Sequence, residues 1–162
     1  MNTASPSVGI EHASMASPVG NLRIEADAGR IVSVTMVNAR SSKSPVRSKI
    51  LRECQRQLTE YFSGRRTSFT LPLAESGTLF QRTVRKALAS VESGTTLTYG
   101  ELAKRSGFPK AIRAVASVVA NNPFGIVVPC HRIVPSSGVQ PGKYAWGTSK
   151  KKWLLEHEGN RS

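Results

Sequence analysis

A cysteine followed directly by a histidine gives the sequence its clearest chemical signal, in the segment Pro129-Cys130-His131-Arg132. A thiolate is a soft nucleophile, and a neighbouring imidazole can accept the thiol proton. The same residues also suit a structural role, as a buried cysteine beside a hydrogen-bonded core histidine. The four residues alone leave both interpretations open, and the first predicts a nucleophilic site at Cys130.

The residues on either side of Pro129 to Arg132 predict that this segment is buried and that it follows a helical region. Apolar, β-branched runs flank it, Gly125 to Val128 before and Ile133-Val134 after. A helix is expected from Phe80 until Gly94 stops it. Thr98 and Glu101 then have the spacing of a capping box, which predicts a short helix ending at Gly107.

A second helix, opened by Pro109, would complete a helix-turn-helix. Its inward-facing residues are expected to be Ile112, Val115, Ala116 and Val119. Lys110 and Arg113 fall on its first turns, where a recognition helix contacts nucleic acid. Many helical hairpins bind no DNA, so this spacing alone is a weak signal.

The first half of the chain predicts a small antiparallel sheet and one helix. Residues 1–14 are polar and are expected to be frayed. Asn21 to Ala26 and Ile31 to Val37 have strand patterns. Pro45 to Phe62 reads as a helix with Ser44 as N-cap, a core Cys54 on its apolar stripe and a stop at Gly64; Phe69 to Leu73 reads as a short edge strand.

Composition and charge narrow the class of protein. The 162 residues carry a net charge of +13, of which +4 lies in residues 1–76 and +9 in residues 77–162. A basic second half is typical of a protein with a polyanionic partner such as nucleic acid, but charge alone leaves the alternative of mere solubility open. No run is long enough to span a bilayer, no secretory signal is visible, and two cysteines cannot build a disulfide scaffold. We therefore expect an intracellular protein, in the nucleus of a eukaryote or the cytoplasm or nucleoid of a prokaryote.

The stretch from Phe80 to Glu158 resembles the active-site domain of the O6-alkylguanine-DNA alkyltransferases, the methylated-DNA–protein-cysteine methyltransferases. The resemblance lies in several ordered blocks: Phe80-Gln81, Thr98-Tyr99, Arg113-Ala114-Val115, Asn122-Pro123, Pro129 to Ile133 and Trp153 to Gly159. It implies a two-domain α/β (α+β) fold. Residues 1–76 would form a ribonuclease-like supporting domain with a small antiparallel sheet and a helix. Residues 77–162 would form a mainly helical DNA-binding and active-site domain with a winged-helix-like helix-turn-helix.

The resemblance also assigns catalytic roles. Cys130 would accept the alkyl group, His131 would take the thiol proton through a bridging water, and Glu158 would orient the imidazole. Asn122 would bridge the active-site turn and the recognition helix, and Tyr99 would meet the target nucleotide. Each also has an ordinary structural reading: Tyr99 as a packed first-turn residue, Asn122 as a turn residue, Glu158 as a solvated carboxylate. The transfer would be a single-turnover reaction on O6-methylguanine, and on O4-methylthymine, without cofactor or metal.

Further residues are implied for DNA and for the flipped base. Arg113 would fill the gap in the base stack, and the DNA contacts would comprise Arg113, Tyr99, Lys110, Arg132 and Ala114. The substrate pocket would comprise Ile133, Ala145, Trp146, Tyr144 and Lys151. Lys151 would shape the pocket loop, while the Lys150–Lys152 run otherwise reads as a solvated helix face. The bulk of Trp146 predicts poor tolerance of benzyl adducts. The partner would be duplex DNA carrying O6-alkylguanine, bound by a monomer, with cooperative assembly left open.

The chain departs from the family pattern at several places, and other functions compete. The loop from Gln140 to Lys143 reads slightly long, and Ala145-Trp146 places a bulky ring where some members carry smaller residues. Arg85 stands where the family commonly has Trp, Ala116-Ser117 where a Gly is usual, and Asn121 before Asn122 where a Gly is usual. A non-enzymatic lesion-binding relative would lack the acceptor cysteine, which is present here. A helix-turn-helix regulator fused to a zinc sensor would need a cysteine cluster that this sequence lacks. A Cys/His hydrolase would turn over acyl substrates, and the Pro-Cys-His-Arg context argues against it.

Overall fold

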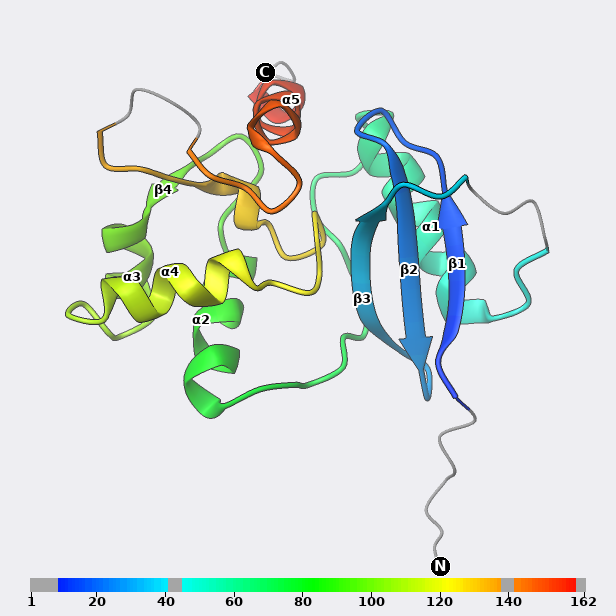
Figure 1. Cartoon of the computed structure of the whole chain (residues 1–162), viewed down its shortest axis with the longest axis horizontal. Coiled ribbons are helices and arrows are strands. Elements are labelled where there is room, and N and C mark those ends of the chain that lie inside the picture. The colour runs from blue at the N-terminus through cyan, green and yellow to red at the C-terminus, as the bar shows by residue number, and fades with distance from the viewer. Residues whose placement is uncertain (1–8, 41–44, 138–141, 160–162) are drawn as a thin grey trace, which may run out of the picture. The chain divides into compact units, whose positions relative to one another are not determined.

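A computed structural model describes residues 9–40, 45–137 and 142–159. The chain divides into two compact units, Met1–Ala74 and Glu75–Ser162, and this division lies two residues before the boundary predicted between residues 76 and 77. The first unit contains a sheet and a helix, and the second is mainly helical (Figure 1). The predicted two-domain α/β fold is confirmed.

The first unit is a three-stranded antiparallel meander with one helix packed on it. Its strands are β1 (Glu11–Met15), β2 (Asn21–Asp27) and β3 (Arg30–Val37), in the order β1-β2-β3. Strand β2 alternates between buried and half-buried residues, which is the pattern of a sheet with one face on the core. The expectation of a frayed stretch up to residue 14 is wrong for residues 11–14, because β1 pairs with β2 along its whole length.

Helix α1 (Lys49–Phe62) buries its apolar stripe against this sheet. It begins later than predicted, because Pro45 to Ser48 are not helical and the Ser48 hydroxyl accepts from the backbone N–H of Leu51. Ser44, the predicted N-cap, lies outside the described residues. Cys54 is fully buried, as expected of a core residue. The predicted edge strand at Phe69 to Leu73 is reduced to one bridge, in which Leu73 pairs with Ile31.

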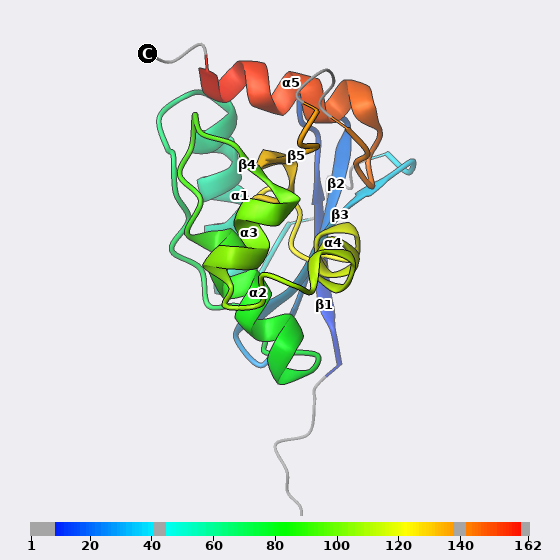
Figure 2. The same ribbon diagram turned by 90° about the vertical axis from the view of Figure 1, so that its left-hand side faces the viewer.

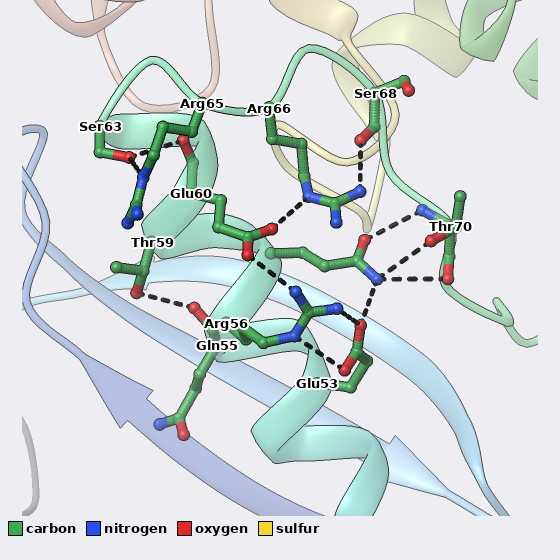
Figure 3. A network of polar contacts seen from close by, with 11 residues as sticks. Glu53, Gln55, Arg56, Thr59, Glu60, Ser63, Arg65, Arg66, Ser68 and Thr70 are labelled. Atoms are coloured by element: carbon green, nitrogen blue, oxygen red, sulfur yellow. Dashed lines mark hydrogen bonds and ion pairs between the residues drawn. The ribbon is translucent and has the colours of Figure 1, made fainter.

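A polar network ties the segment after α1 back to the helix (Figure 3). Arg56 lies between Glu53 and Glu60, and Arg66 donates to Glu60 over 2.9 Å. The side chain of Gln57 accepts from the backbone N–H of Thr70 over 2.9 Å. The Arg56 pairs are exposed and lie within α1, so we expect them to contribute little to stability. The contacts of Arg66 and Gln57 are partly buried and join the segment after α1 to the helix.

The second unit packs its helices around a two-residue parallel ladder. It contains α2 (Leu79–Ala89), β4 (Leu97–Thr98), α3 (Tyr99–Arg105), α4 (Ile112–Ala120), the 3-10 helix η1 (Cys130–Arg132), β5 (Ile133–Val134) and α5 (Thr148–Gly159). Strands β4 and β5 pair in parallel. Figures 1 and 2 both show this ladder between α5 on one side and α2, α3 and α4 on the other.

Helices α3 and α4 form the predicted helix-turn-helix. Thr98 and Glu101 make the expected capping box. Phe108, in the turn between the helices, packs on Phe80 of α2 with ring centroids 4.7 Å apart. Helix α4 begins at Ile112, three residues after the predicted start at Pro109, and Ile112 is 46% exposed rather than inward-facing. In the part of the chain that the structure describes, no helix has the length and apolar character to cross a membrane.

Candidate active site

Cys130 is the first residue of η1 and lines a cavity of about 380 Å³. The other lining residues come from three elements of the second unit: Tyr99 of α3, then Ala116, Val119 and Ala120 of α4, then Lys143, Tyr144 and Ala145 of the loop before α5. Cys130 is a free cysteine and is 7% exposed. The thiol is thus enclosed by the protein but open to a cavity with the dimensions of a small ligand site.

The loop before Cys130 is held by the side chain of Asn122. Its amide nitrogen donates to the carbonyl of Val128 over 2.8 Å and to that of Phe124 over 3.3 Å. Its amide oxygen accepts from the backbone N–H of Phe124 over 3.1 Å. Ile126, inside this loop, has a φ of +68°, an unfavourable value for a β-branched residue. The Asn122 bonds therefore close a strained turn that sets the position of the nucleophile.

His131 lies behind the nucleophile in a buried charged cluster. Its Nε2 lies 2.7 Å from Oε2 of Glu158 on α5. Arg132 grips the same carboxylate with two bonds, Nε to Oε1 over 2.9 Å and Nη2 to Oε2 over 2.8 Å. All three side chains are almost fully buried. The arrangement has the form of a nucleophile, a histidine and a carboxylate that orients it.

Burial dominates the electrostatics of the thiol and the imidazole. Burial raises the pKa of Cys130, which hydrogen bonding from Asn122 and Tyr144 and the charge of Lys151 counter only in part. Burial also lowers the pKa of His131, although the Glu158 carboxylate opposes this. The pair is therefore held as thiol and neutral imidazole at rest, and the thiol must lose its proton to react.

For the carboxyl of Glu158, the hydrogen bonds together affect the pKa more than burial does. Burial would raise its pKa, but hydrogen bonds from His131 and Arg132 outweigh burial and hold the pKa well below the usual range. Glu158 is therefore an ionised acceptor at neutral pH. Glu158 is buried and hydrogen-bonded to His131, which excludes the solvated carboxylate considered from the sequence.

Lys151 is buried instead of lying on a solvated face of α5. Its Nζ donates to the carbonyl of Ile133 over 2.6 Å and to that of Lys143 over 3.2 Å. Burial lowers its pKa to about 8, while Cys130 acts in the opposite direction. The solvated-face reading of the Lys150–Lys152 run is therefore wrong for Lys151. This lysine ties β5 to the loop that lines the cavity.

Tyr99 reaches the cavity because the β4–β5 ladder brings two distant segments together. Thr98 pairs with Val134, so the first residue of α3 lies near the residues that follow Cys130. Burial raises the pKa of Tyr99, with a further contribution from Cys130. The hydroxyl is thus a neutral hydrogen-bond donor at physiological pH.

Arg113 and Ala114 lie exposed on the first turn of α4, and Lys110 lies exposed in the turn before it. Three small or apolar residues of the same helix, Ala116, Val119 and Ala120, line the cavity. One helix therefore carries an exposed cation on its first turn and contributes three residues to the wall of the cavity that contains the thiol. This is the geometry expected of a helix that binds nucleic acid next to a reaction site.

Of the predicted pocket residues, Tyr144 and Ala145 line the cavity, whereas Ile133, Trp146 and Lys151 do not. The predicted DNA contacts also need a correction. Arg132 was expected to contact DNA, but it is 4% exposed and bound to Glu158, so its side chain is not on a DNA-facing surface. Ile133 is fully buried, and Trp146 packs on Tyr144 with ring centroids 5.7 Å apart.

Four cavity residues were not predicted as pocket residues: Ala116, Val119, Ala120 and Lys143. Ala116 and Val119 were taken as core residues, since helical spacing marks a buried face but not what covers it. Of the residues that depart from the family pattern, Arg85, Ser117 and Asn121 line a separate polar cavity of about 230 Å³ in the same unit, whereas Ala116 lines the cavity that contains the thiol.

Known proteins resemble both units of the chain. The family model for the DNA-binding domain of 6-O-methylguanine DNA methyltransferase matches residues 79–160, and that for its ribonuclease-like domain matches residues 10–74. The methylated-DNA–protein-cysteine methyltransferase of Mycobacterium leprae is 38% identical over 149 residues, 90% of each chain. That of Methanosarcina acetivorans is 46% identical over 112 residues, 69% of this chain and 71% of its own.

Solved structures agree with this similarity. The O6-methylguanine methyltransferase of Mycobacterium tuberculosis superimposes with a TM-score of 0.82 and 32% identity, covering 95% of each chain. A structure of that organism's OGT in complex with DNA gives a TM-score of 0.82 and 34% identity, covering 93% of this chain and 94% of its own. Together with the cysteine, histidine and glutamate assembled beside the cavity, these similarities show that the chain belongs to the methylated-DNA–protein-cysteine methyltransferase family of DNA repair enzymes.

Proposed function

We propose that the protein repairs O6-methylguanine, and O4-methylthymine, in duplex DNA by moving the methyl group to Cys130 once per molecule. The observation that carries the proposal is the position of Cys130, which lines a cavity of about 380 Å³ directly before a histidine bonded to a buried carboxylate. The O6 carbon is inaccessible inside the duplex, so the base must leave the stack to reach this cavity.

DNA binding is assigned to the exposed start of α4. Arg113 enters the base stack and replaces the extruded nucleotide, while Lys110 and Ala114 lie against the backbone. Tyr99, at the cavity, meets the target nucleotide and donates a hydrogen bond toward the leaving guanine. Because the base is recognised after it has left the stack, we expect little preference for the surrounding sequence.

The transfer is a displacement at a saturated carbon. The thiol proton of Cys130 passes through a water molecule to Nδ1 of His131, and the sulfur forms a bond to the methyl carbon. The bond between this carbon and O6 breaks, its electron pair stays on the guanine, and a proton from the site restores the neutral base. Burial raises the pKa of Cys130, so the reaction depends on this proton acceptor.

The stability of the methylated cysteine explains why each protein molecule reacts once. A thioether is not cleaved by water, and the reaction has no tetrahedral intermediate and so does not depend on an oxyanion hole. The methylated Cys130 therefore persists, and each molecule acts once. The balance of atoms needs no cofactor and no metal.

A reaction with methylated DNA in excess over the protein tests whether each molecule acts once. Duplex DNA containing O6-methylguanine is mixed with a limiting amount of protein, and repaired guanine is counted by nucleoside chromatography. One guanine restored per protein molecule, and none with Cys130→Ser, is the expected result. Continuing turnover, or tight lesion binding with no repair, would contradict it. Cys54→Ser is the matched control, because Cys54 is buried in the other unit and lines no part of the cavity.

A further inference from the structure

Arg132 uses all three nitrogens of its guanidinium in the buried cluster. Nε and Nη2 bind the two oxygens of Glu158, over 2.9 and 2.8 Å. Nη1 donates to the backbone carbonyl of Val91 over 2.5 Å. This one side chain therefore joins η1, helix α5 and the turn that follows α2. A two-bond grip of this kind fixes the plane of the carboxylate as well as its position.

The two hydrogen bonds from Arg132 to Glu158 determine which nitrogen of His131 carries its hydrogen. An arginine in a protein keeps its charge, so Glu158 beside it stays a carboxylate and only accepts hydrogen bonds. Nε2 of His131, 2.7 Å away, must then be the donor. The other nitrogen, Nδ1, is buried and has no hydrogen-bond partner among the described residues. Nδ1 is thus left with a lone pair to accept a proton.

Burial favours the neutral form of His131, and the charges of Arg132 and Lys151 add to this effect while Glu158 opposes it. Glu158 and Lys151 face it from α5, Arg132 and Cys130 belong to its own turn, and the ring of Tyr144 lies 6.5 Å away. The charge of Arg132 balances that of Glu158. A proton on His131 would leave the buried cluster with a net positive charge beside Lys151, which burial disfavours.

We propose that Arg132 is a positioning residue for alkyl transfer, which holds His131 neutral with its hydrogen on Nε2 and its lone pair on Nδ1. The inference rests on the proposed function, because it names the group that prepares the base for that reaction. It assigns to Arg132 a role inside the site in place of the DNA contact expected from the sequence.

The pH profile of single-turnover methyl transfer tests the proposal. Removing a buried cation raises the pKa of a nearby imidazole and of a nearby thiol alike, so the acid limb of the Arg132→Gln profile moves to higher pH. On the acid limb, where His131 is becoming protonated, a displacement of one unit makes the variant about tenfold slower, and the difference shrinks as the pH rises above the pKa of His131. Arg132→Lys keeps the charge without the two-bond grip, so it is slower at every pH with the acid limb unmoved.

Lys152→Gln is the matched control, because it removes one positive charge from the exposed side of α5. Its profile is expected to coincide with that of the unmodified protein. If Arg132→Gln is slower by one constant factor at every pH, the arginine is merely structural and the proposal is wrong. If the unmodified protein itself transfers no methyl group, the proposed function fails instead, and the two failures are thus distinguishable.

Nitrogen NMR of the unmodified protein keeps the proposal testable if Arg132→Gln does not fold. The histidine ring nitrogens are labelled, and His131 is recognised as the signal that His131→Gln removes. A neutral ring with hydrogen on Nε2 at neutral pH, protonated only well below the usual pKa of about 6.5, is the expected result. An imidazolium at pH 7, or hydrogen on Nδ1 of the neutral ring, would overturn the proposal.

Discussion

Replacement of Asn122 by alanine is predicted to damage both the stability of the second unit and the transfer reaction. The substitution removes the bond to the Val128 carbonyl at 2.8 Å and the bond from the Phe124 N–H at 3.1 Å. Each is worth roughly 1 kcal/mol, and the backbone N–H of the buried Phe124 loses its partner. We therefore expect a loss of about 2 to 3 kcal/mol in the free energy of unfolding.

Urea unfolding and single-turnover methyl transfer measure the two effects. Asn121→Ala is the matched control, because this neighbouring asparagine is exposed and its side chain makes one bond within α4, to the Ser117 carbonyl. It should change stability by no more than about 0.5 kcal/mol. Equal stability losses for the two variants, or an unchanged transfer rate for Asn122→Ala, would refute the reasoning.

Asn122→Asp distinguishes the effect of this side chain on the position of the loop from its effect on the ionisation of Cys130. The aspartate keeps an acceptor for the Phe124 N–H, but it sets an oxygen against the Val128 carbonyl and adds a negative charge beside Cys130. A nearby negative charge raises the pKa of a thiol. Transfer near pH 7 should therefore be slower in Asn122→Asp than in Asn122→Ala. The reverse order would mean that the amide does not act on the thiol.

Three further outcomes are expected. The depressed pKa of Glu158 means that its stabilising effect is complete above the unfolded value of 4.5 and is lost as pH falls from there, so Glu158→Gln should flatten stability curves measured by urea unfolding below about pH 5. Arg113→Ala and Lys110→Ala should each weaken binding to undamaged duplex and lower the salt slope in titrations by about 1 where the cation contacts a phosphate. Cys54 has no exposed surface whereas Cys130 lines a cavity, so iodoacetamide should label Cys130 first in mass spectra.

Local patterns predicted the elements that bury apolar stripes or carry caps. The alternation of Asn21 to Ala26 predicted β2, and Thr98 with Glu101 predicted the start of α3. Strand β1 was missed because Glu11 to Met15 contains little apolar alternation, and its partner β2 supplies the pairing. The start of α1 was placed early because Pro45 is also a good first helical residue, while Ser48 forms the cap.

The burial of two charged side chains could not be predicted from the sequence. Arg132 and Lys151 look like solvated cations because their partners lie far along the chain: Glu158 and Val91 for Arg132, and Ile133 for Lys151. The residues of α4 that line the cavity could not be predicted for a similar reason. Ala116 and Val119 have the spacing of a core face, and only the fold shows that this face borders a cavity containing Cys130.

Peptide mass spectrometry after reaction with O6-methylguanine duplex tests the central claim most directly. Protein and duplex are mixed in equal amounts, the intact mass is recorded, and the digested protein is sequenced. The account predicts the mass of one methyl group per protein, found on the peptide containing Cys130, and no gain in Cys130→Ser. A methyl group on Cys54, or a lesion-bound protein with no gain in mass, would contradict the account.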